Sequence, residues 1–135
     1  SNICTNQGLL VTAGTIYMSL MGPQGIRETA LDCHRKTNEL RQRLLQVEGV
    51  SDFFSGPTFH EFALKLPVPT ERIVEQMMKQ GILAGLNLAD FSSKTLADAK
   101  YGLLIAVTEK RTEAEMDQYV TAFDQAITSA AGANS

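Results

Sequence analysis

The sequence predicts an α+β domain built of two layers. Three observations support this prediction: an apolar stripe at helical spacing, a continuous apolar strand late in the chain, and a final helix that opens with a capping box. The expected order is two helices, a strand, a helix, two strands and a helix, which is typical of helices packed against one sheet. With 135 residues, 44% of them hydrophobic and 20% charged, the chain can bury a core of its own.

The first predicted helix, residues 5–21, is free of charge. Residues 1–26 contain no Asp, Glu, Lys, Arg or His, whereas a surface helix normally has a charged, solvated face. We therefore expect another domain or subunit to cover it. The apolar run is too short for a membrane span and lacks the positive flank of a signal peptide. Because the chain does not begin with Met, we expect it to be part of a longer one.

The second predicted helix begins at Pro23, a residue favoured in a first helical turn, and the preceding helix ends at Gly22. Its solvated side carries favourable ion pairs four residues apart, such as Asp32 with Lys36. We expect Gly49 to end it. Its inner side is a single stripe with alternating steps of four and three residues, formed by Ile26, Ala30, Cys33, Thr37, Leu40, Leu44 and Val47.

The middle of the chain predicts a strand, a helix and a second, shorter strand. Residues 58–66 alternate, with His60, Phe62, Leu64 and Leu66 on the expected buried face. Thr70 is expected to cap a helix over 71–80, and Gly81 to end it in a left-handed conformation. Residues 82–86 predict the short strand, and residues 87–100 a loop with one helical turn.

The last third predicts a central strand and a long helix. Residues 103–107 are continuously apolar, as in a strand buried on both faces. Thr112 and Glu115 form a capping box. The chain from Ser129 is expected to fray. The inner face of the last helix is expected to carry Met116, Tyr119, Val120, Phe123 and Ile127.

Composition disfavours several functions. The net charge is −3, with both signs mixed along the chain, which disfavours a nucleic-acid surface. The two cysteines, Cys4 and Cys33, give no metal-ligand spacing and no disulfide framework. We therefore expect a reducing compartment, by default the cytoplasm or an organelle lumen of similar redox state. The isolated His34 and His60 have no ligand partner at suitable spacing, so we expect no metal site.

Six stretches together resemble the C-terminal region of the glycine cleavage system P-protein family, glycine dehydrogenase (decarboxylating), and above all subunit 1 of its two-subunit bacterial form. The resemblance covers all 135 residues. Two positions depart from the family pattern, His60 in place of Asn and Asn87 in place of Pro. The stretches are Ser1-Asn2-Ile3-Cys4-Thr5-Asn6-Gln7, Gly22-Pro23-Gln24-Gly25-Ile26, Phe54-Ser55-Gly56-Pro57, Glu61-Phe62-Ala63-Leu64-Lys65-Leu66-Pro67, Gly81-Ile82-Leu83-Ala84-Gly85-Leu86 and Val107-Thr108-Glu109-Lys110-Arg111-Thr112.

This resemblance implies the small C-terminal domain (23–135) of a fold-type-I pyridoxal-phosphate enzyme, preceded by a connecting helix (1–22). It implies glycine decarboxylation on pyridoxal phosphate and transfer of the aminomethyl group to the lipoyl H-protein. It places the Schiff-base lysine on subunit 2, because no lysine here has the family's His-Lys context. We expect no catalytic residue and no bound cofactor in this chain, which should be inactive alone.

Two groups of residues are candidates for a site. Asn2, Cys4, Thr5 and Asn6 crowd a helix start, where free N–H groups meet an anion or a partner; the simpler interpretation is helix capping. Arg111 follows a central strand, where small domains of this fold often bind a carboxylate, and a solvated turn is the alternative.

Two other functions remain open from the sequence. One is the small domain of another fold-type-I enzyme, and the other is a stand-alone α+β regulatory or ligand-binding module. For the chain in isolation, we expect self-association through the 5–21 helix.

Overall fold

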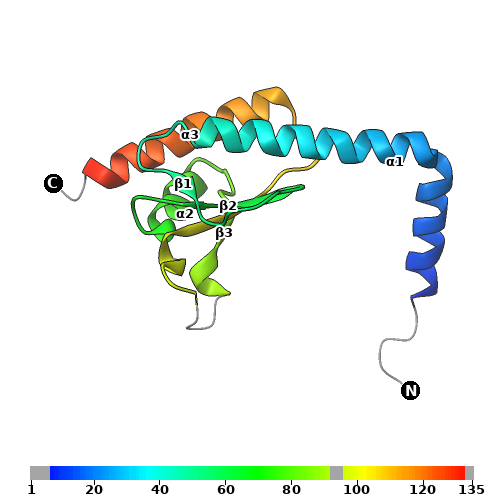
Figure 1. Ribbon diagram of the computed structural model, residues 1–135, viewed down its shortest axis with the longest axis horizontal. Helices are drawn as coiled ribbons and strands as arrows, with labels where there is room; N and C mark the ends of the chain where they lie inside the picture. The colour runs from blue at the N-terminus through cyan, green and yellow to red at the C-terminus, as the bar shows by residue number, and fades with distance from the viewer. Residues whose placement is uncertain (1–6, 92–95, 133–135) are drawn as a thin grey trace, which may run out of the picture.

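The computed structural model describes residues 7–91 and 96–132 and has the predicted α+β class (Figure 1). Two short 3₁₀ turns, η1 (Leu88–Asp90) and η2 (Ala99–Tyr101), lie between the third and the fourth strand along the chain. The helices and strands are α1 (Gly8–Leu44), β1 (Ser51–Asp52), β2 (Glu61–Lys65), α2 (Thr70–Lys79), β3 (Leu86–Asn87), β4 (Gly102–Ala106) and α3 (Glu113–Gly132).

The four strands form one antiparallel sheet in the order β1-β2-β4-β3. β4 pairs with β2 along its whole length, from Gly102 opposite Lys65 to Ala106 opposite Glu61. On its other side β3 pairs only with Leu103 and Leu104. The prediction that the late apolar strand is central is therefore confirmed, although one of its edges is covered over only two residues.

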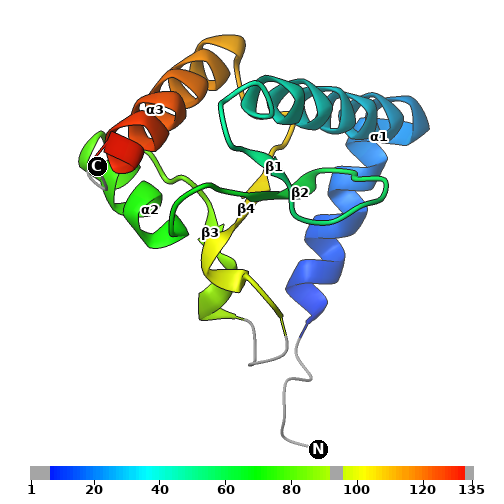
Figure 2. The same ribbon diagram turned by 60° about the vertical axis from the view of Figure 1, so that its left-hand side comes forward.

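The helices α2, α3 and the second half of α1 share one core with the sheet (Figure 2). Alternate side chains of β2 and β4 point into this core because side chains along a strand alternate between faces. The fully buried members include Leu44 of α1, Leu64 of β2, Ile73 and Met77 of α2, Leu103 of β4 and Phe123 of α3. The other face of the sheet is partly covered near Gly102 by Leu88 and Phe53. A Cβ added to Gly102 would lie 2.6 Å from Leu88 Cδ1 and 3.0 Å from Phe53 Cε2.

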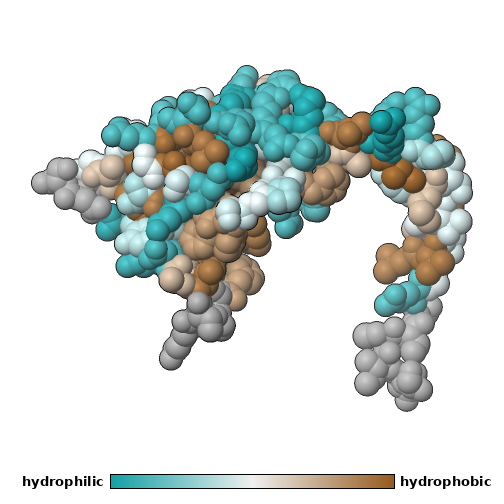
Figure 3. Space-filling model, in the orientation of Figure 1, coloured by the Kyte–Doolittle hydropathy of each residue, from teal (hydrophilic) through white to brown (hydrophobic). Residues whose placement is uncertain are grey.

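α1 bends sharply at Gly22, which has a non-helical backbone (φ 62°, ψ 178°) and is followed by Pro23. The predicted break between two helices is thus confirmed. Residues 8–21, termed the arm, turn away from the body (Figure 1), and hydrophobic side chains are visible on it in Figure 3. Leu9 is 81% exposed and Leu20 82%. Among the described residues, no helix is both long and apolar enough to cross a membrane.

The second predicted strand is displaced. Residues 82–85 form an irregular connection, and β3 begins only at Leu86. Gly85 has φ 141°, and a Cβ there would lie 2.3 Å from the carbonyl oxygen of Leu104. The apolar run at 82–86 was a misleading signal, because this glycine lets the chain pass close to β4 without pairing along it.

Four smaller predictions were wrong. α1 ends at Leu44 rather than at Gly49. β2 begins at Glu61, so His60 lies outside the strand and is exposed. Thr70 is the first residue of α2 rather than its cap, and its buried hydroxyl has no hydrogen-bond partner among the described residues. α3 extends to Gly132 rather than fraying at Ser129, because Ala130 is buried in the core. Gly81, with φ 75°, ends α2 as predicted.

Replacing Gly85 by Ala should destabilise the protein by about 3 kcal/mol or more, because left-handed strain adds to a clash with the backbone of β4. Gly81→Ala is the matched control. Gly81 also has a positive φ, but nothing lies within 4 Å of its would-be Cβ, so we expect a loss of only about 1 kcal/mol. Urea unfolding measures both, and equal losses would contradict the close approach at Gly85.

Candidate functional site

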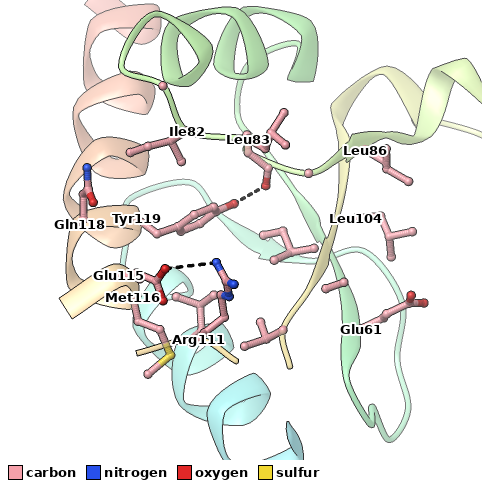
Figure 4. Close-up of a pocket in the computed structure, with 17 residues that line it drawn as sticks. Glu61, Ile82, Leu83, Leu86, Leu104, Arg111, Glu115, Met116, Gln118 and Tyr119 are labelled. Carbon is pink, nitrogen blue, oxygen red and sulfur yellow. Dashed lines mark hydrogen bonds and ion pairs between the residues drawn. The ribbon is translucent and has the colours of Figure 1, made fainter. Parts of the chain in front are cut away.

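A groove of about 640 Å³ lies between residues 81–86, the end of β4 and the start of α3 (Figure 4). We term it the β4–α3 groove. One wall is the connection that carries Ile82 and Leu83, and the other is the first turns of α3, with Met116 and Tyr119. Most of these side chains are apolar, so the groove suits an apolar occupant more than a highly charged one.

Tyr119 joins the two walls. It reaches across from α3, and its hydroxyl donates a hydrogen bond to the carbonyl oxygen of Ala84 (Figure 4). Its ring stacks on Phe123, with ring centroids 6.3 Å apart. Burial raises the pKa of Tyr119, so the hydroxyl stays protonated and remains a donor. This bond fixes the position of the irregular connection relative to α3.

Arg111 lies at the rim, where it pairs with Glu115. The distance from Arg111 Nη1 to Glu115 Oε1 is 3.3 Å. The other oxygen of Glu115 accepts the N–H of Thr112 at 2.8 Å, while Thr112 Oγ1 accepts the N–H of Glu115 at 3.2 Å. This is the predicted capping box. The hydrogen bonds from Thr112, with Arg111 nearby, hold the pKa of Glu115 below its ordinary value.

α1 holds the segment that leads from β4 to Arg111. Thr37 Oγ1 lies 3.3 Å from the carbonyl oxygen of Val107, and Lys36 Nζ donates to the carbonyl oxygen of Glu109 at 2.6 Å. The N–H of Glu109 donates to Cys33 Sγ at 3.2 Å. Burial, followed by the Glu109 carboxylate, raises the pKa of Cys33, so this thiol is a structural group rather than a reactive one.

In the described ranges, no lysine lines the β4–α3 groove or a second hollow beside β1. Lys36 bonds to Glu109 and Asp32, and Lys65 pairs with Asp98 at 2.6 Å. No three His, Cys, Asp or Glu side chains in the described ranges gather closely enough to hold a metal ion.

Of the predicted site residues, the structure places only Arg111. Asn2, Cys4, Thr5 and Asn6 lie outside the described residues. Arg111 is half exposed at the rim of the groove, with its guanidinium shared with Glu115, so its role as a carboxylate-binding residue remains a prediction. The spacing of apolar residues in the last helix predicts Tyr119 only as a core residue. Its hydroxyl contact with Ala84, 35 residues away, has no local sequence signal.

The fold is a small α+β domain with a four-stranded antiparallel sheet and a groove between β4 and α3. The family model for the glycine cleavage system P-protein matches residues 1–123 of this chain. The chain therefore belongs to the glycine cleavage system P-protein family.

Similar proteins agree with this assignment. The chain is 44% identical over 94% of its length to the "Probable glycine dehydrogenase (decarboxylating) subunit 1" of Nitrosospira multiformis, and 48% identical over 90% of its length to the protein of the same name from Coxiella burnetii. It spans 27% and 26% of the lengths of these two relatives.

A solved structure is also similar. The crystal structure of a glycine decarboxylase (P-protein) of the glycine cleavage system, in inhibitor-bound form, superposes with a TM-score of 0.80 at 31% sequence identity. The match covers 93% of this chain and 28% of that one. The described fold is thus that of one part of a P-protein.

Tyr119→Phe should destabilise the protein by about 2 kcal/mol, because the buried carbonyl of Ala84 loses its donor. Amides of residues 82–86 should also exchange faster with solvent. Tyr17→Phe is the control, because Tyr17 is 52% exposed on the arm and should be nearly neutral. Urea unfolding and hydrogen exchange test this, and unchanged exchange at 82–86 would show that the hydroxyl does not hold the connection.

Proposed function

We propose that this chain is the small domain of subunit 1 of a glycine decarboxylase, in which residues 1–22 connect to a larger domain and 23–135 form the small domain of a fold-type-I enzyme. The observation that carries the proposal is the identity of 44–48% to subunit 1 proteins over at least 90% of the chain. The reported matches favour this function over a different fold-type-I enzyme and over a stand-alone module.

The proposed reaction is decarboxylation of glycine in the cytoplasm, with transfer of the remaining aminomethyl group to the lipoyl H-protein. Pyridoxal phosphate, when bound elsewhere in the enzyme, supplies the electron sink. As the family resemblance implies, we assign the Schiff-base lysine to subunit 2; no described lysine lines the β4–α3 groove or the hollow beside β1. This domain then contributes walls and contacts, with Asn2, Cys4, Thr5 and Asn6 at the active-site entrance or subunit interface.

The proposal is tested with the whole subunit 1 that contains this chain. Subunit 1, subunit 2 and H-protein are purified separately and assayed together for glycine-dependent exchange of labelled bicarbonate. We expect exchange only when both subunits are present. Exchange by subunit 2 without subunit 1, or no exchange with glycine in the full mixture, would contradict the proposal.

Arg111 is proposed to bind a carboxylate in the assembled enzyme. Its side chain is 52% exposed, and its guanidinium donates one N–H group to Glu115, so other donors remain for a second carboxylate. The position after β4 is held by the contacts from α1, which limits its movement.

In the whole enzyme, Arg111→Gln should raise the KM for glycine about tenfold or more, because a charge-assisted hydrogen bond is lost. Arg43→Gln is the control, since Arg43 is also partly exposed and paired, with Asp117 at 2.7 Å, but lies outside the groove. Exchange kinetics with varied glycine measure the effect. Equal KM values for both variants would contradict the proposed role, and Arg111 would then only form a surface ion pair with Glu115.

The arm is proposed to pack on the larger domain and on subunit 2, and to mediate self-association when this chain is isolated. Its apolar side chains are exposed around most of the helix, including Leu10 at 71% and Ile16 at 54%. Such a surface is larger than a soluble monomer normally leaves open.

In isolation, the chain should sediment as a dimer, and the double variant Leu10→Lys with Tyr17→Lys should sediment as a folded monomer, because charges on the arm prevent its apolar packing. The control double variant, Leu31→Lys with Met78→Lys, changes equally exposed residues away from the arm and should leave the dimer intact. Analytical ultracentrifugation with circular dichroism tests this. A monomeric unsubstituted chain would refute self-association through the arm.

A further inference from the structure

Beyond Leu104, the edge of β4 that faces β3 has main-chain groups without a partner among the described residues. In an antiparallel sheet, successive residues direct their N–H and C=O groups to opposite neighbours. Val107 N–H donates to His60 and Tyr101 O accepts from Leu66, so the odd-numbered residues of this stretch bond toward β2. Leu104 pairs on the other side, with Leu86. Ala106 is next along that side and is exposed.

The chain that would continue β3 turns away before it reaches Ala106. By the register of β3, Ala84 would lie opposite Ala106, but its carbonyl oxygen instead accepts the Tyr119 hydroxyl. Gly85 provides the backbone conformation for this departure. Among the described residues, no group forms a hydrogen bond with the N–H or C=O of Ala106.

These groups open into the β4–α3 groove, whose walls are apolar. Leu83 on the connection is 77% exposed, and Leu86 at the start of β3 is 51% exposed. Both line the groove, and Figure 4 shows Leu86 beside Leu104. Arg111 and Glu115 pair with each other at the rim, and Glu61 is a further, half-exposed carboxylate that lines the groove. An occupant that matches this groove offers one main-chain donor, one main-chain acceptor and apolar side chains.

We propose that an extended peptide segment adds to the edge of β4 at Ala106, and that it comes from the part of subunit 1 outside this chain. Strand addition of this kind uses main-chain hydrogen bonds for affinity and pockets for alternate side chains. The relative from Nitrosospira multiformis is about three and a half times as long as this chain, whose match covers 27% of it. The remaining length supplies a segment at high effective concentration.

A second copy of this chain fits the edge poorly. Pairing two copies of β4 would bring β3 and the 82–85 connection of each copy against those of the other, because both flank the open edge. The part of β4 that lacks a partner strand begins only after Leu104. Across the groove from it lie Arg111 and the first turns of α3. A single extended chain is narrow enough to enter, whereas another sheet edge is not.

The first test is hydrogen exchange of single amides in the whole subunit 1, without subunit 2. The amide of Ala106 should exchange roughly a hundredfold slower than an exposed amide, similar to that of Val107, which bonds to His60. Exchange of Ala106 at the rate of an exposed loop amide would overturn the proposal. This measurement requires no glycine activity, so its failure is distinct from a failure of the proposed function, on which the source of the segment rests.

The second test identifies the segment. Leu83 is replaced by the photo-cross-linker p-benzoylphenylalanine in the whole subunit 1, and Leu31, which is 55% exposed on α1 and outside the groove, is replaced in a control. After irradiation with subunit 2 and H-protein present, the variant at position 83 should cross-link to one stretch of subunit 1 outside this chain, and the control should not. Cross-links to subunit 2, to H-protein, to a second copy of this chain, or none at all would overturn the proposal.

Discussion

Three side chains on two successive turns of α1 hold the backbone where it leaves β4, and the rest of the domain depends on these contacts. The main chain of residues 107–109 forms hydrogen bonds with the side chains of Thr37, Lys36 and Cys33. Backbone groups that leave a sheet next to a core need partners, because a buried unpaired group is costly. Once α1 supplies them, Thr112 is placed to start α3, and α3 in turn forms one wall of the groove. Disturbing this contact would therefore affect the core and the groove together.

The bend at Gly22 separates two kinds of helix within α1. The second half has a stripe that fits the sheet, from Cys33 to Leu44, and its other side carries ion pairs such as Lys36 with Asp32. The arm has neither a stripe nor charges, so no orientation on this domain would bury its apolar side chains and solvate the rest. A straight helix would extend the arm along the axis of the second half, whereas the positive φ of Gly22 directs it away from that axis (Figure 1).

The elements with strong local patterns could be predicted from the sequence, and those set by distant contacts could not. The stripe of α1, the break at Gly22-Pro23 and the Thr112–Glu115 box all depend on residues within a few positions of each other. The 82–86 segment has the composition of a strand, but its path is decided by Tyr119 and by the close approach of Gly85 to Leu104. The same holds for the site. Arg111 was visible from its place after a strand, whereas the contact of Cys33 with Glu109 joins residues 76 positions apart.

The arm and the groove are incomplete in different ways, and this difference bears on what the rest of the subunit supplies. The arm lacks apolar contacts, which any convex hydrophobic surface can provide because such packing is weakly directional. The edge at Ala106 lacks main-chain partners, which only an extended backbone in register can provide. The charged groups Lys36, Lys65 and Glu115 are already paired within the domain. In the proposed enzyme, the domain therefore contributes shape and hydrogen-bonding geometry. Arg111, the one cation among the described residues that line the groove, is placed by the same turn that α1 holds.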